Sequence, residues 1–502
     1  MQIDTIGYWI FTGLGWAVGM VMLLLFLLFL QDITQTESAV RRNFPVIGRL
    51  RYFLEKQGEY FRQYFFAHDR EELPFNRATR NWVYNNAKGL SGMIGFGSTN
   101  DLREPGSAIF VNSPYAMLET EQRCAPMLFI GPDCEHPFAA HHIVNISGMS
   151  FAALSAPAVR ALSKGAGKAG IWMNTGEGGL SSHHLEGGCD LIFQIGSAKF
   201  GVRDAKGGLD EQKLKAIAAH DEVKAFEIKL AQGAKPGKGG ILPGAKVTEE
   251  IARIRGIQPG QDAISPNRHR EIATPDDMLD MIARVRDVTG KPVGIKTVIG
   301  TGEYPRRLFE AILRRGVDSA PDFMAIDGGE RGSGAAPQAL ADHVGLPLNE
   351  ALPLVVDLLY EADLRERIRL IASGKLVTSG RVAWALCVGA DFVVTARGFM
   401  FALGCIQSLQ CHLDTCPTGV TTHNPRLQKG LVVEDKAERV ARYARRLNDE
   451  LDMLAHSCGL TCARDFRRQH VRIVQTAGHS ISLERLYPYP KPNPAAFLDR
   501  PA

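Results

Sequence analysis

The amino-acid sequence predicts an α/β protein, a (β/α)8 TIM barrel with one transmembrane helix near its N-terminus. From residue 141 onward, short apolar runs alternate with helical stretches, and this alternation is typical of a parallel sheet covered by helices. Several of these runs end in loops that contain Gly, Ser or Lys. Polar groups at the carboxyl ends of strands are typical of functional (β/α)8 barrels. A long uncharged segment near Met1 predicts the membrane helix.

Residues 5–31 contain no charged side chain, and as a helix they are long enough to cross about 30 Å of hydrocarbon. The alternative is a cleaved signal peptide. It is disfavoured because no Lys or Arg precedes the apolar run and no small-x-small cleavage site follows it. Asp4 precedes the segment, whereas several cations follow it, namely Arg41, Arg42, Arg49, Arg51 and Lys56. The positive-inside rule therefore predicts a single-pass membrane protein with its catalytic domain in the cytoplasm.

Residues 32–90 form a predicted amphipathic lead-in next to the membrane, in which basic residues alternate with aromatic and aliphatic ones. Such a helix can pack on the catalytic domain or lie on anionic lipid, and the sequence leaves both open. The barrel is expected over residues 91–480, followed by a C-terminal tail over residues 481–502. The formal net charge of +4 is too small to indicate nucleic acid as a partner. Nine cysteines among 502 residues do not resemble a secreted disulfide framework.

The apolar runs of the barrel region are expected to be its strands. They are residues 191–195, 226–230, 293–295, 323–326, 370–372 and 392–394. The alternative is a doubly wound sheet, but no Gly-x-Gly-x-x-Gly opens a helix after a strand, so a dinucleotide-binding half is unsupported. Lys296 follows directly after one run, which fits a lysine that points inward from a strand end. The alternative is a lysine that caps a helix C-terminus.

Glycine-containing turns follow the last two runs of the barrel region. Barrels of this kind bind phosphate groups between the loops after strands 7 and 8, through backbone N–H groups at a short helix N-terminus. Here the backbone at Ser379, Gly380 and Ala396, together with Arg397, could bind such a phosphate. The alternative is a pair of tight turns without a ligand.

Three cysteines, Cys405, Cys411 and Cys416, lie on one short segment, and Pro417 follows the last of them. Three thiolates on one segment can hold an iron–sulfur cluster, and a proline after the last ligand recurs in bacterial ferredoxin motifs. Five and then four residues separate the cysteines, which is not the ferredoxin spacing. Three ligands suit a cluster that lacks one corner iron, whereas zinc prefers four ligands. A zinc site and unligated thiols remain the alternatives.

The cysteine segment resembles the iron–sulfur loop of glutamate synthase. Ordered motifs elsewhere agree with the FMN-binding synthase domain of that family, at residues 147–151, 174–179 and 231–237, with a looser match at 328–335. The resemblance covers roughly residues 90–470. It implies an FMN-binding barrel, a 3Fe–4S cluster on the three cysteines, and transfer of a hydride from reduced FMN to the imine of 2-oxoglutarate to give glutamate.

The resemblance also implies roles for single residues. Glu177 would handle the proton or ammonium, and Lys235 would act beside it in catalysis. Lys229, Gln232 and Lys235 would bind the substrate, because its two carboxylates need cations. Lys296 would stabilise the anionic reduced flavin near its N1–C2=O edge. Contacts to the flavin would come from Ser147, Gly148, Met149, Ser150, Gln194, Lys296, Gly328 and Gly329, with Ser379, Gly380, Ala396 and Arg397 at its phosphate.

The sequence departs from the family pattern at several positions near the substrate. Lys238 replaces an acid, Ile241 replaces a glutamine, and Arg331 stands where a glycine is usual. Arg268 and Arg270 lie in a segment that is usually rich in Pro and His. Arg268, Arg270 and Arg331 can each bind a carboxylate bidentately, and Arg268 and Arg331 are expected to contact the substrate. The changes either compensate one another for the same acid or select another anionic substrate.

The sequence and the resemblance together predict reductive amination of 2-oxoglutarate to glutamate by a membrane-anchored FMN and iron–sulfur enzyme. No nucleophilic cysteine follows Met1 and no NAD(P)H fingerprint is present, so external ammonia or an amine, and a ferredoxin or flavoprotein electron donor, are the expected partners. One alternative makes N-methylglutamate from methylamine, as a similar domain does in multi-subunit enzymes. Another is an electron-transfer subunit that passes electrons between a membrane quinone or ferredoxin and a partner, without an amino acid product.

Overall fold

The structure is a computed structural model that describes residues 2–90 and 92–498. It divides into two units, Met1–Thr79 and Arg80–Ala502, and each unit is described by itself. Residues 80–90, expected as the end of the lead-in, lie in the second unit.

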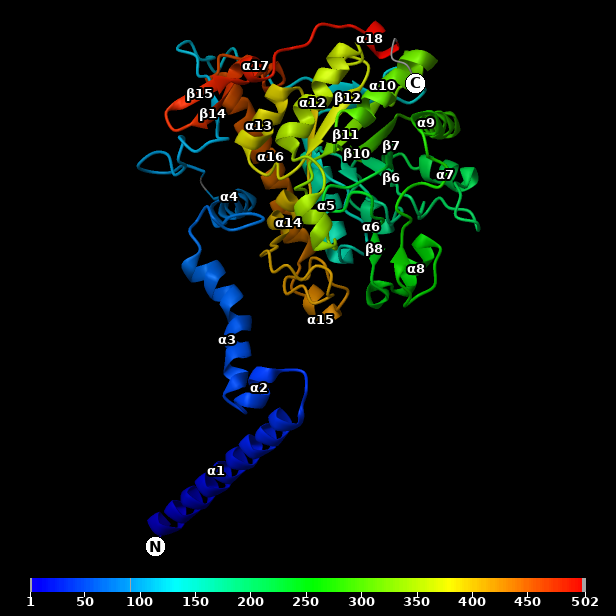
Figure 1. The fold of residues 1–502 in the computed structure, drawn as a ribbon. Coiled ribbons are helices and arrows are strands. Elements are labelled where there is room, and N and C mark those ends of the chain that lie inside the picture. Colours follow the sequence, from blue (N-terminus) through cyan, green and yellow to red (C-terminus); the bar gives the residue numbers. More distant parts are fainter. Residues whose placement is uncertain (1, 91, 499–502) are drawn as a thin grey trace. The chain divides into compact units, whose positions relative to one another are not determined.

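The first unit consists of helices joined by short turns (Figure 1). α1 (Gln2–Thr34) is followed by α2 (Ala39–Asn43), α3 (Gly48–Phe61) and a π-helical turn, η1 (Arg62–Phe66). Within α1, Gly7–Thr34 is long and apolar enough to cross a membrane, and none of its most apolar window is buried in the structure. A signal sequence near an N-terminus has the same length and composition, so the membrane span stays a prediction.

Asp32 holds the bend that follows α1. Its buried carboxylate accepts hydrogen bonds from Arg41 Nε at 2.9 Å, from Arg49 Nη2 at 2.7 Å and from the Val46 backbone N–H at 2.9 Å. Such partners offset the cost of taking a carboxylate out of water. Two of the cations behind the orientation prediction, Arg41 and Arg49, are therefore paired within the unit.

The second unit contains a closed barrel of parallel strands, which confirms the barrel prediction. In spatial order the strands are β4 (Val144–Ile146), β5 (Met173–Asn174), β6 (Leu191–Ile195), β7 (Val223–Lys229), β10 (Val293–Val298), β11 (Phe323–Asp327), β12 (Arg369–Ser373) and β13 (Phe392–Thr395). β13 pairs in parallel with β4, and this pairing closes the barrel. Every predicted apolar run falls on one of these strands, whereas β4 and β5 are too short to stand out as runs.

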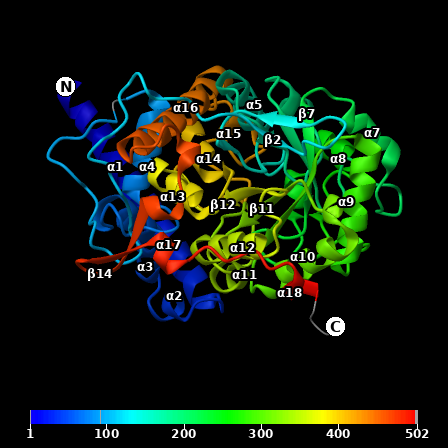
Figure 2. The same ribbon diagram turned by 90° about the horizontal axis from the view of Figure 1, so that it is seen from above.

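Helices cover the outside of the barrel, as the view in Figure 2 shows. The chain between Ser155 and Gly170 illustrates why they form. The Ser155 hydroxyl accepts from the Ala158 N–H at the start of α5, and Gly170 ends the helix with a left-handed φ of 68°. The covering helices are α5 (Ala156–Ala169), α6 (Ser182–Leu185), α7 (Glu211–Ala218), α9 (Pro275–Thr289), α10 (Glu303–Arg315), α12 (Leu348–Glu361), α13 (Ser379–Val388) and α16 (Val433–Ser457).

A hairpin closes the amino-terminal end of the barrel. It consists of β2 (Leu128–Ile130) and β3 (Phe138–Ala140). Ile130 and Phe138 are buried in one cluster with Phe323 and Phe392, the first residues of β11 and β13. The barrel therefore has an apolar floor, and its polar groups gather at the carboxyl ends of the strands.

Further segments surround the carboxyl ends of the strands. After β7 come β8 (Ile241–Leu242), η2 (Gly244–Lys246), α8 (Glu249–Arg255) and β9 (Ala263–Ile264). After β11 comes α11 (Gln338–His343), whereas η3 (Val317–Ser319) follows α10 and leads into the start of β11, at the other end of the barrel. α14 (Arg397–Leu403) and α15 (Pro425–Gln428) follow β13 and flank the cysteine segment.

The remaining elements lie at the periphery of this unit. β1 (Ala108–Phe110), β14 (Val471–Thr476) and β15 (His479–Ser482) form an antiparallel sheet. The other elements are α4 (Arg77–Lys88), η4 (Ala463–Asp465), η5 (Arg468–His470), α17 (Leu483–Leu486) and α18 (Ala495–Leu498). The expected C-terminal tail thus contributes the end of β15, α17 and α18.

Candidate active site

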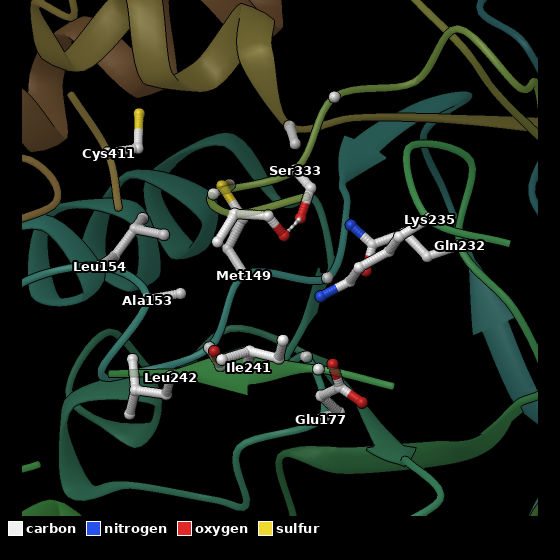
Figure 3. Close-up of a pocket in the computed structure, with 18 of the residues that line it drawn as sticks. Met149, Ala153, Leu154, Glu177, Gln232, Lys235, Ile241, Leu242, Ser333 and Cys411 are labelled. Atoms are coloured by element: carbon white, nitrogen blue, oxygen red, sulfur yellow. Dashed lines mark hydrogen bonds between the residues drawn. The ribbon is translucent and has the colours of Figure 1, made fainter. Parts of the chain in front are cut away.

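A cavity with an empty volume of about 1050 Å³ lies at the carboxyl ends of the strands. Figure 3 shows Glu177, Gln232 and Lys235 on one side of the cavity and Ala153 and Leu154 on another. Its walls come from the ends of β4, β5, β6, β7, β10, β11 and β13, through Gly148, Gly176, Gln194, Lys229, Lys296, Arg331 and Ala396.

Glu177, Lys229, Gln232 and Lys235 meet in this cavity. Lys229 Nζ lies 2.9 Å from Glu177 Oε1 and 2.8 Å from Gln232 Oε1. Burial raises the pKa of the Glu177 carboxyl, but Lys229 and Lys235 outweigh it and lower the pKa to about 2. Burial and the neighbouring Lys229 lower the pKa of the Lys235 ammonium to about 8. The cavity thus places a permanent carboxylate beside a lysine that can exchange a proton near neutral pH.

Arg255, the last residue of α8, is a cavity residue that sequence reasoning missed. Its buried guanidinium lies over the ring of Phe200, with Cζ 4.9 Å from the ring centroid. Within the part of the chain that the structure describes, Arg255 Nε has no hydrogen-bond partner. A buried cation with an unused donor can bind an anionic group. No sequence pattern marks Arg255 as a cavity residue, because an arginine in the last turn of a helix usually interacts with the helix dipole.

Gly148 presents bare backbone to the cavity. A Cβ atom at this position would lie 2.9 Å from Asn174 Oδ1 and 3.2 Å from Gln194 Nε2, so a side chain does not fit. The buried Glu227 fixes both neighbours, since its Oε1 accepts from Asn174 Nδ2 at 2.9 Å and from Gln194 Nε2 at 2.5 Å. Glu227 and Asn174 are thus positioning residues that the motif comparison did not identify. Met149 also lines this wall, as does Ser150.

Lys296 and Arg331 share the carboxylate of Asp327, and all three are buried. Asp327 Oδ1 lies 3.5 Å from Lys296 Nζ and 3.3 Å from Arg331 Nε. Burial lowers the pKa of Lys296, and the neighbouring Arg331 lowers it further. Arg331 Nη2 also donates to the Ser147 hydroxyl at 2.6 Å. Arg331, expected at the substrate, therefore lies with two residues that were expected at the flavin.

The two expected flavin residues Gly328 and Gly329 pack against the chain instead of lining the cavity. A Cβ atom at Gly329 would lie 2.4 Å from the carbonyl oxygen of Gly345. A Cβ atom at Gly328 would lie 2.2 Å from Glu330 Oε2. Their observed role is close packing of the loop after β11.

The expected phosphate residues fall into two groups. Ala396 and Arg397 line the cavity at the start of α14. Ser379 and Gly380 begin α13 outside the cavity lining, and the Ser379 hydroxyl donates to Glu450 at 2.8 Å. Backbone N–H groups in the first turn of a helix have no acceptor within that helix, so those of Ser379 and Gly380 can serve a phosphate.

Arg268 lies in a separate pocket, away from the cavity. Its Nη1 donates to the backbone carbonyl oxygens of His269, Arg270 and Ile272, at 3.1, 3.4 and 2.9 Å. The side chain thus stabilises its own turn, and the structure does not bring it together with Glu177 and Lys235.

The three cysteines lie on the segment between α14 and α15, and Cys411 lines the cavity. Burial, together with the nearby Cys411 and Cys416, raises the pKa of the Cys405 thiol to about 11. Burial also raises the pKa of Cys416, but hydrogen bonds with Thr418 and Thr421 outweigh it and lower the pKa. Across residues 2–90 and 92–498, no three His, Cys, Asp or Glu side chains converge as ligands of a single metal ion. The ligands of a cluster bind different iron atoms and stand farther apart than those of one ion.

Lys246 fastens the cysteine segment to the cavity wall. Its buried Nζ donates to the carbonyl oxygens of Cys411 at 2.8 Å and Thr421 at 2.5 Å. The Tyr84 hydroxyl, from α4, donates to the Cys405 carbonyl oxygen at 2.6 Å. Sequence reasoning missed both residues, because their roles depend on contacts between distant parts of the chain.

The chain is similar to several known proteins. Residues 97–461 match the conserved region in glutamate synthase. The chain is 44% identical over 497 residues to the glutamate synthase large subunit-like protein YerD of Bacillus subtilis, covering 91% of this chain and 94% of that protein. It is 32% identical over 392 residues to the archaeal-type glutamate synthase (NADPH) of Thermotoga neapolitana, covering 78% and 74%.

Other relatives match over a smaller share of their length. The archaeal glutamate synthase (NADPH) of Methanocaldococcus jannaschii is 36% identical over 332 residues, which cover 66% of this chain and 61% of that protein. Among solved structures, flavocytochrome b2 with bound pyruvate is 13% identical, with a TM-score of 0.44 over 89% of this chain and 91% of that chain. The extent of the match to the conserved region, and the identity to the Bacillus relative over most of both chains, show that this chain is an oxidoreductase of the glutamate synthase family.

Proposed function

We propose that this protein forms glutamate from 2-oxoglutarate and ammonia, as a membrane-anchored FMN and iron–sulfur enzyme that takes electrons from a separate donor protein. One observation carries the proposal: Glu177, Lys229 and Lys235 share a cavity with Lys296 and Cys411. A substrate, a flavin and a cluster could therefore exchange protons and electrons within one space. The family supports the reaction class, since several relatives carry the name glutamate synthase.

The cavity residues fit FMN. Gly148 brings its backbone to the wall without a side chain, and Lys296 and Arg331 bring two cations to one carboxylate. When bound, FMN would supply a hydride to the substrate carbon. Lys296 would then hold positive charge where the reduced ring becomes anionic.

The other side of the cavity fits a dicarboxylate. Lys229, Lys235 and Arg255 line it and offer charged donors, each worth about 1.5–3 kcal/mol when hydrogen-bonded. Glu177, ionised at neutral pH because its pKa is about 2, would hold the ammonium or iminium nitrogen. Lys235, with a pKa of about 8, would pass protons to and from the oxygen that leaves as the imine forms.

The cysteine segment fits an iron–sulfur cluster by its donor chemistry. Cys405 and Cys416 are buried, Cys411 lines the cavity, and the Lys246 ammonium lies beside the segment. When bound, a 3Fe–4S cluster would pass single electrons to the flavin. The Lys246 charge would favour the more negative, reduced state of such a cluster. A ferredoxin or a flavoprotein would supply those electrons from the cytoplasm, where the α1 anchor would hold the catalytic unit.

The decisive experiment follows the flavin of anaerobically reduced protein after mixing with candidate substrates. We expect 2-oxoglutarate with ammonium to reoxidise the flavin and to yield glutamate in equal amount. Omission of ammonium should abolish the reaction, and Glu177→Gln should slow it strongly while FMN stays bound. Protein that lacks FMN and does not bind it on addition would contradict the proposal at its base.

Two further arms test the other functions. The apolar side of the cavity, with Ala153, Leu154 and Leu242, could accept the methyl group of methylamine, so methylammonium is compared with ammonium (Figure 3). Faster reoxidation with methylammonium, and N-methylglutamate as product, would assign the amine-using reaction instead. Reoxidation by a soluble quinone, with no amino acid from any oxo acid, would assign an electron-transfer subunit.

A further inference from the structure

Arg331 bridges two strand ends on either side of β13. Its Nε donates to the Ser373 hydroxyl at 3.0 Å, and its Nη2 donates to the Ser147 hydroxyl at 2.6 Å. Ser373 ends β12, Ser147 directly follows β4, and β13 lies between these two strands in the barrel. Arg331 is only 7% exposed and lines the cavity. Both ends of its guanidinium are therefore fixed at one part of the cavity wall.

Arg331 and Lys296 share the carboxylate of Asp327. Asp327 Oδ1 lies 3.3 Å from Arg331 Nε and 3.5 Å from Lys296 Nζ, so two cations share one carboxylate. All three side chains are buried, and the buried carboxylate of Glu227 also acts on Lys296. Lys296 and Arg331 both line the cavity, so two neighbouring cations face a ligand there.

The Glu177 and Lys229 pair of the cavity has hydrogen-bond partners that differ from those of Arg331. Lys229 pairs with Glu177 and Gln232, whereas the side-chain hydrogen bonds of Arg331 go to Ser147 and Ser373. Arg331 thus shares a counterion with Lys296 and makes no hydrogen bond with the Glu177 and Lys229 pair, although its charge helps to lower the pKa of Lys235.

We infer that Arg331 is a second flavin-ring cation, which acts with Lys296 on the N1–C2=O edge of FMN and does not bind the substrate carboxylate. This inference rests on the proposed function, because it requires FMN in the cavity. The reduced ring is anionic and the oxidised ring is neutral, so a fixed cation stabilises the reduced form more. Arg331 then raises the reduction potential of the bound flavin and tightens the binding of its reduced form.

The test compares two variants of the full chain. Arg331→Gln keeps hydrogen-bond donors near the two serines but removes the charge, and Arg331→Lys keeps the charge. For each, the flavin midpoint potential, the Kd values for FMN and for riboflavin, and the apparent KM for 2-oxoglutarate are measured. Riboflavin lacks the phosphate, so it separates a ring contact from a phosphate contact.

We expect Arg331→Gln to weaken binding of reduced relative to oxidised flavin about tenfold, which lowers a two-electron midpoint potential by about 30 mV. The effect should be equal for FMN and riboflavin, Arg331→Lys should restore most of it, and the KM should change little. An unchanged potential in Arg331→Gln would overturn the inference. Weaker binding of FMN with unchanged binding of riboflavin would also overturn it, because Arg331 would then contact the phosphate. A raised KM for 2-oxoglutarate as the only change would overturn it too, because Arg331 would then bind the substrate. Wild-type protein that fails to bind FMN would instead refute the proposed function.

Discussion

At the scale of single residues, the proton on Lys235 decides how the cavity treats an anion. Its pKa of about 8 is lowered by burial and by Lys229. Below that pH the ammonium attracts a carboxylate, and above it the neutral amine does not. We expect the affinity for the anionic substrate to fall as the pH rises through about 8. Lys235→Ala should lower that affinity at neutral pH by about ten- to a hundred-fold, because a charged hydrogen bond is worth about 1.5–3 kcal/mol.

The measurement is the apparent affinity for the oxo acid between pH 6 and pH 9.5, in wild type, in Lys235→Ala and in Lys238→Ala. Lys238 is an exposed lysine on the same segment and should leave the affinity unchanged. FMN content should be equal in all three proteins. The same pH profile in Lys235→Ala and wild type would refute the assignment.

Arg255 offers a second test at the residue scale. Its Nε has no partner among the described residues, and it lines the cavity near Glu177. We expect Arg255→Gln to raise the KM for the oxo acid by about tenfold or more, since it removes one charged donor. Arg203→Gln is the matched control, because Arg203 lies over the same Phe200 ring, with Cζ 5.9 Å from its centroid, but outside the cavity. Equal KM values in the two variants would exclude Arg255 as a substrate ligand.

Site residues that lie in recognisable motifs could be predicted from the sequence. Site residues whose roles depend on contacts with distant segments could not. Glu177, Lys229 and Lys235 stand in recognisable runs, and the cavity brings them together. Glu227 and Lys246 carry no local pattern, because each is defined by hydrogen bonds to segments far along the chain. A lone arginine gives no direction for its side chain either, and for this reason Arg268 and Arg331 were both expected at the substrate.

At the scale of elements, the cysteine segment and the flavin wall use different residues. Cys411→Ser should therefore lose iron and acid-labile sulfide while FMN stays largely bound. Cys124→Ser is the control, since Cys124 is exposed and lies outside the segment. Iron, sulfide and flavin are measured in protein prepared without oxygen. Iron and sulfide near zero in wild type would remove the cluster from the proposal, and equal iron in Cys411→Ser and wild type would remove Cys411 as a ligand.

Strand length decided which elements could be predicted from the sequence. Runs such as Leu191–Ile195 are apolar except for Gln194, because they are buried on both faces of a parallel sheet. β5, with only Met173 and Asn174, is too short to form a recognisable run. The two strands in the segment after β7 could not be predicted either. β8 and β9 have only two residues each, and each pairs with the other.

At the scale of the whole molecule, α1 is expected to anchor the chain with its catalytic unit in the cytoplasm. The uncharged span Gly7–Thr34 and the cations after it support this prediction. Protease added to intact spheroplasts should leave the catalytic unit whole and should digest it after lysis. Washing membranes with high salt should not release the chain. Digestion from outside would reverse the topology, and release by salt would contradict the anchor.

The source of electrons is a second question for the whole molecule. Relatives from Thermotoga and Methanocaldococcus carry NADPH in their names. This chain shows no dinucleotide-binding fingerprint, and the substrate would occupy the mouth where NADPH could meet the ring. We expect neither NADH nor NADPH alone to bleach the flavin in stopped-flow mixing, whereas a reduced ferredoxin or flavoprotein should do so. Rapid bleaching by either nucleotide would contradict the need for a donor protein.

The barrel itself was predictable because its periodic pattern extends over many residues. Alternation of apolar runs and helices persists from residue 141 to the last strand, so a few missed strands did not change the fold class. The division after Thr79 was harder to predict, because it falls inside α4 (Arg77–Lys88) and not in the loop that precedes this helix. Nothing in local patterning indicates where tertiary packing begins.

The hairpin of β2 and β3 has a kinetic consequence. With Ile130 and Phe138 filling the floor, substrates and products exchange at the mouth of the barrel, where Cys411 also lies. Under the proposed function, a donor protein that docks over the cysteine segment would stand in the path of product release. Each cycle would then alternate between reduction of the protein, with the donor bound, and release of product after the donor has left. Excess donor should slow turnover, and the rate should pass through a maximum as donor concentration rises.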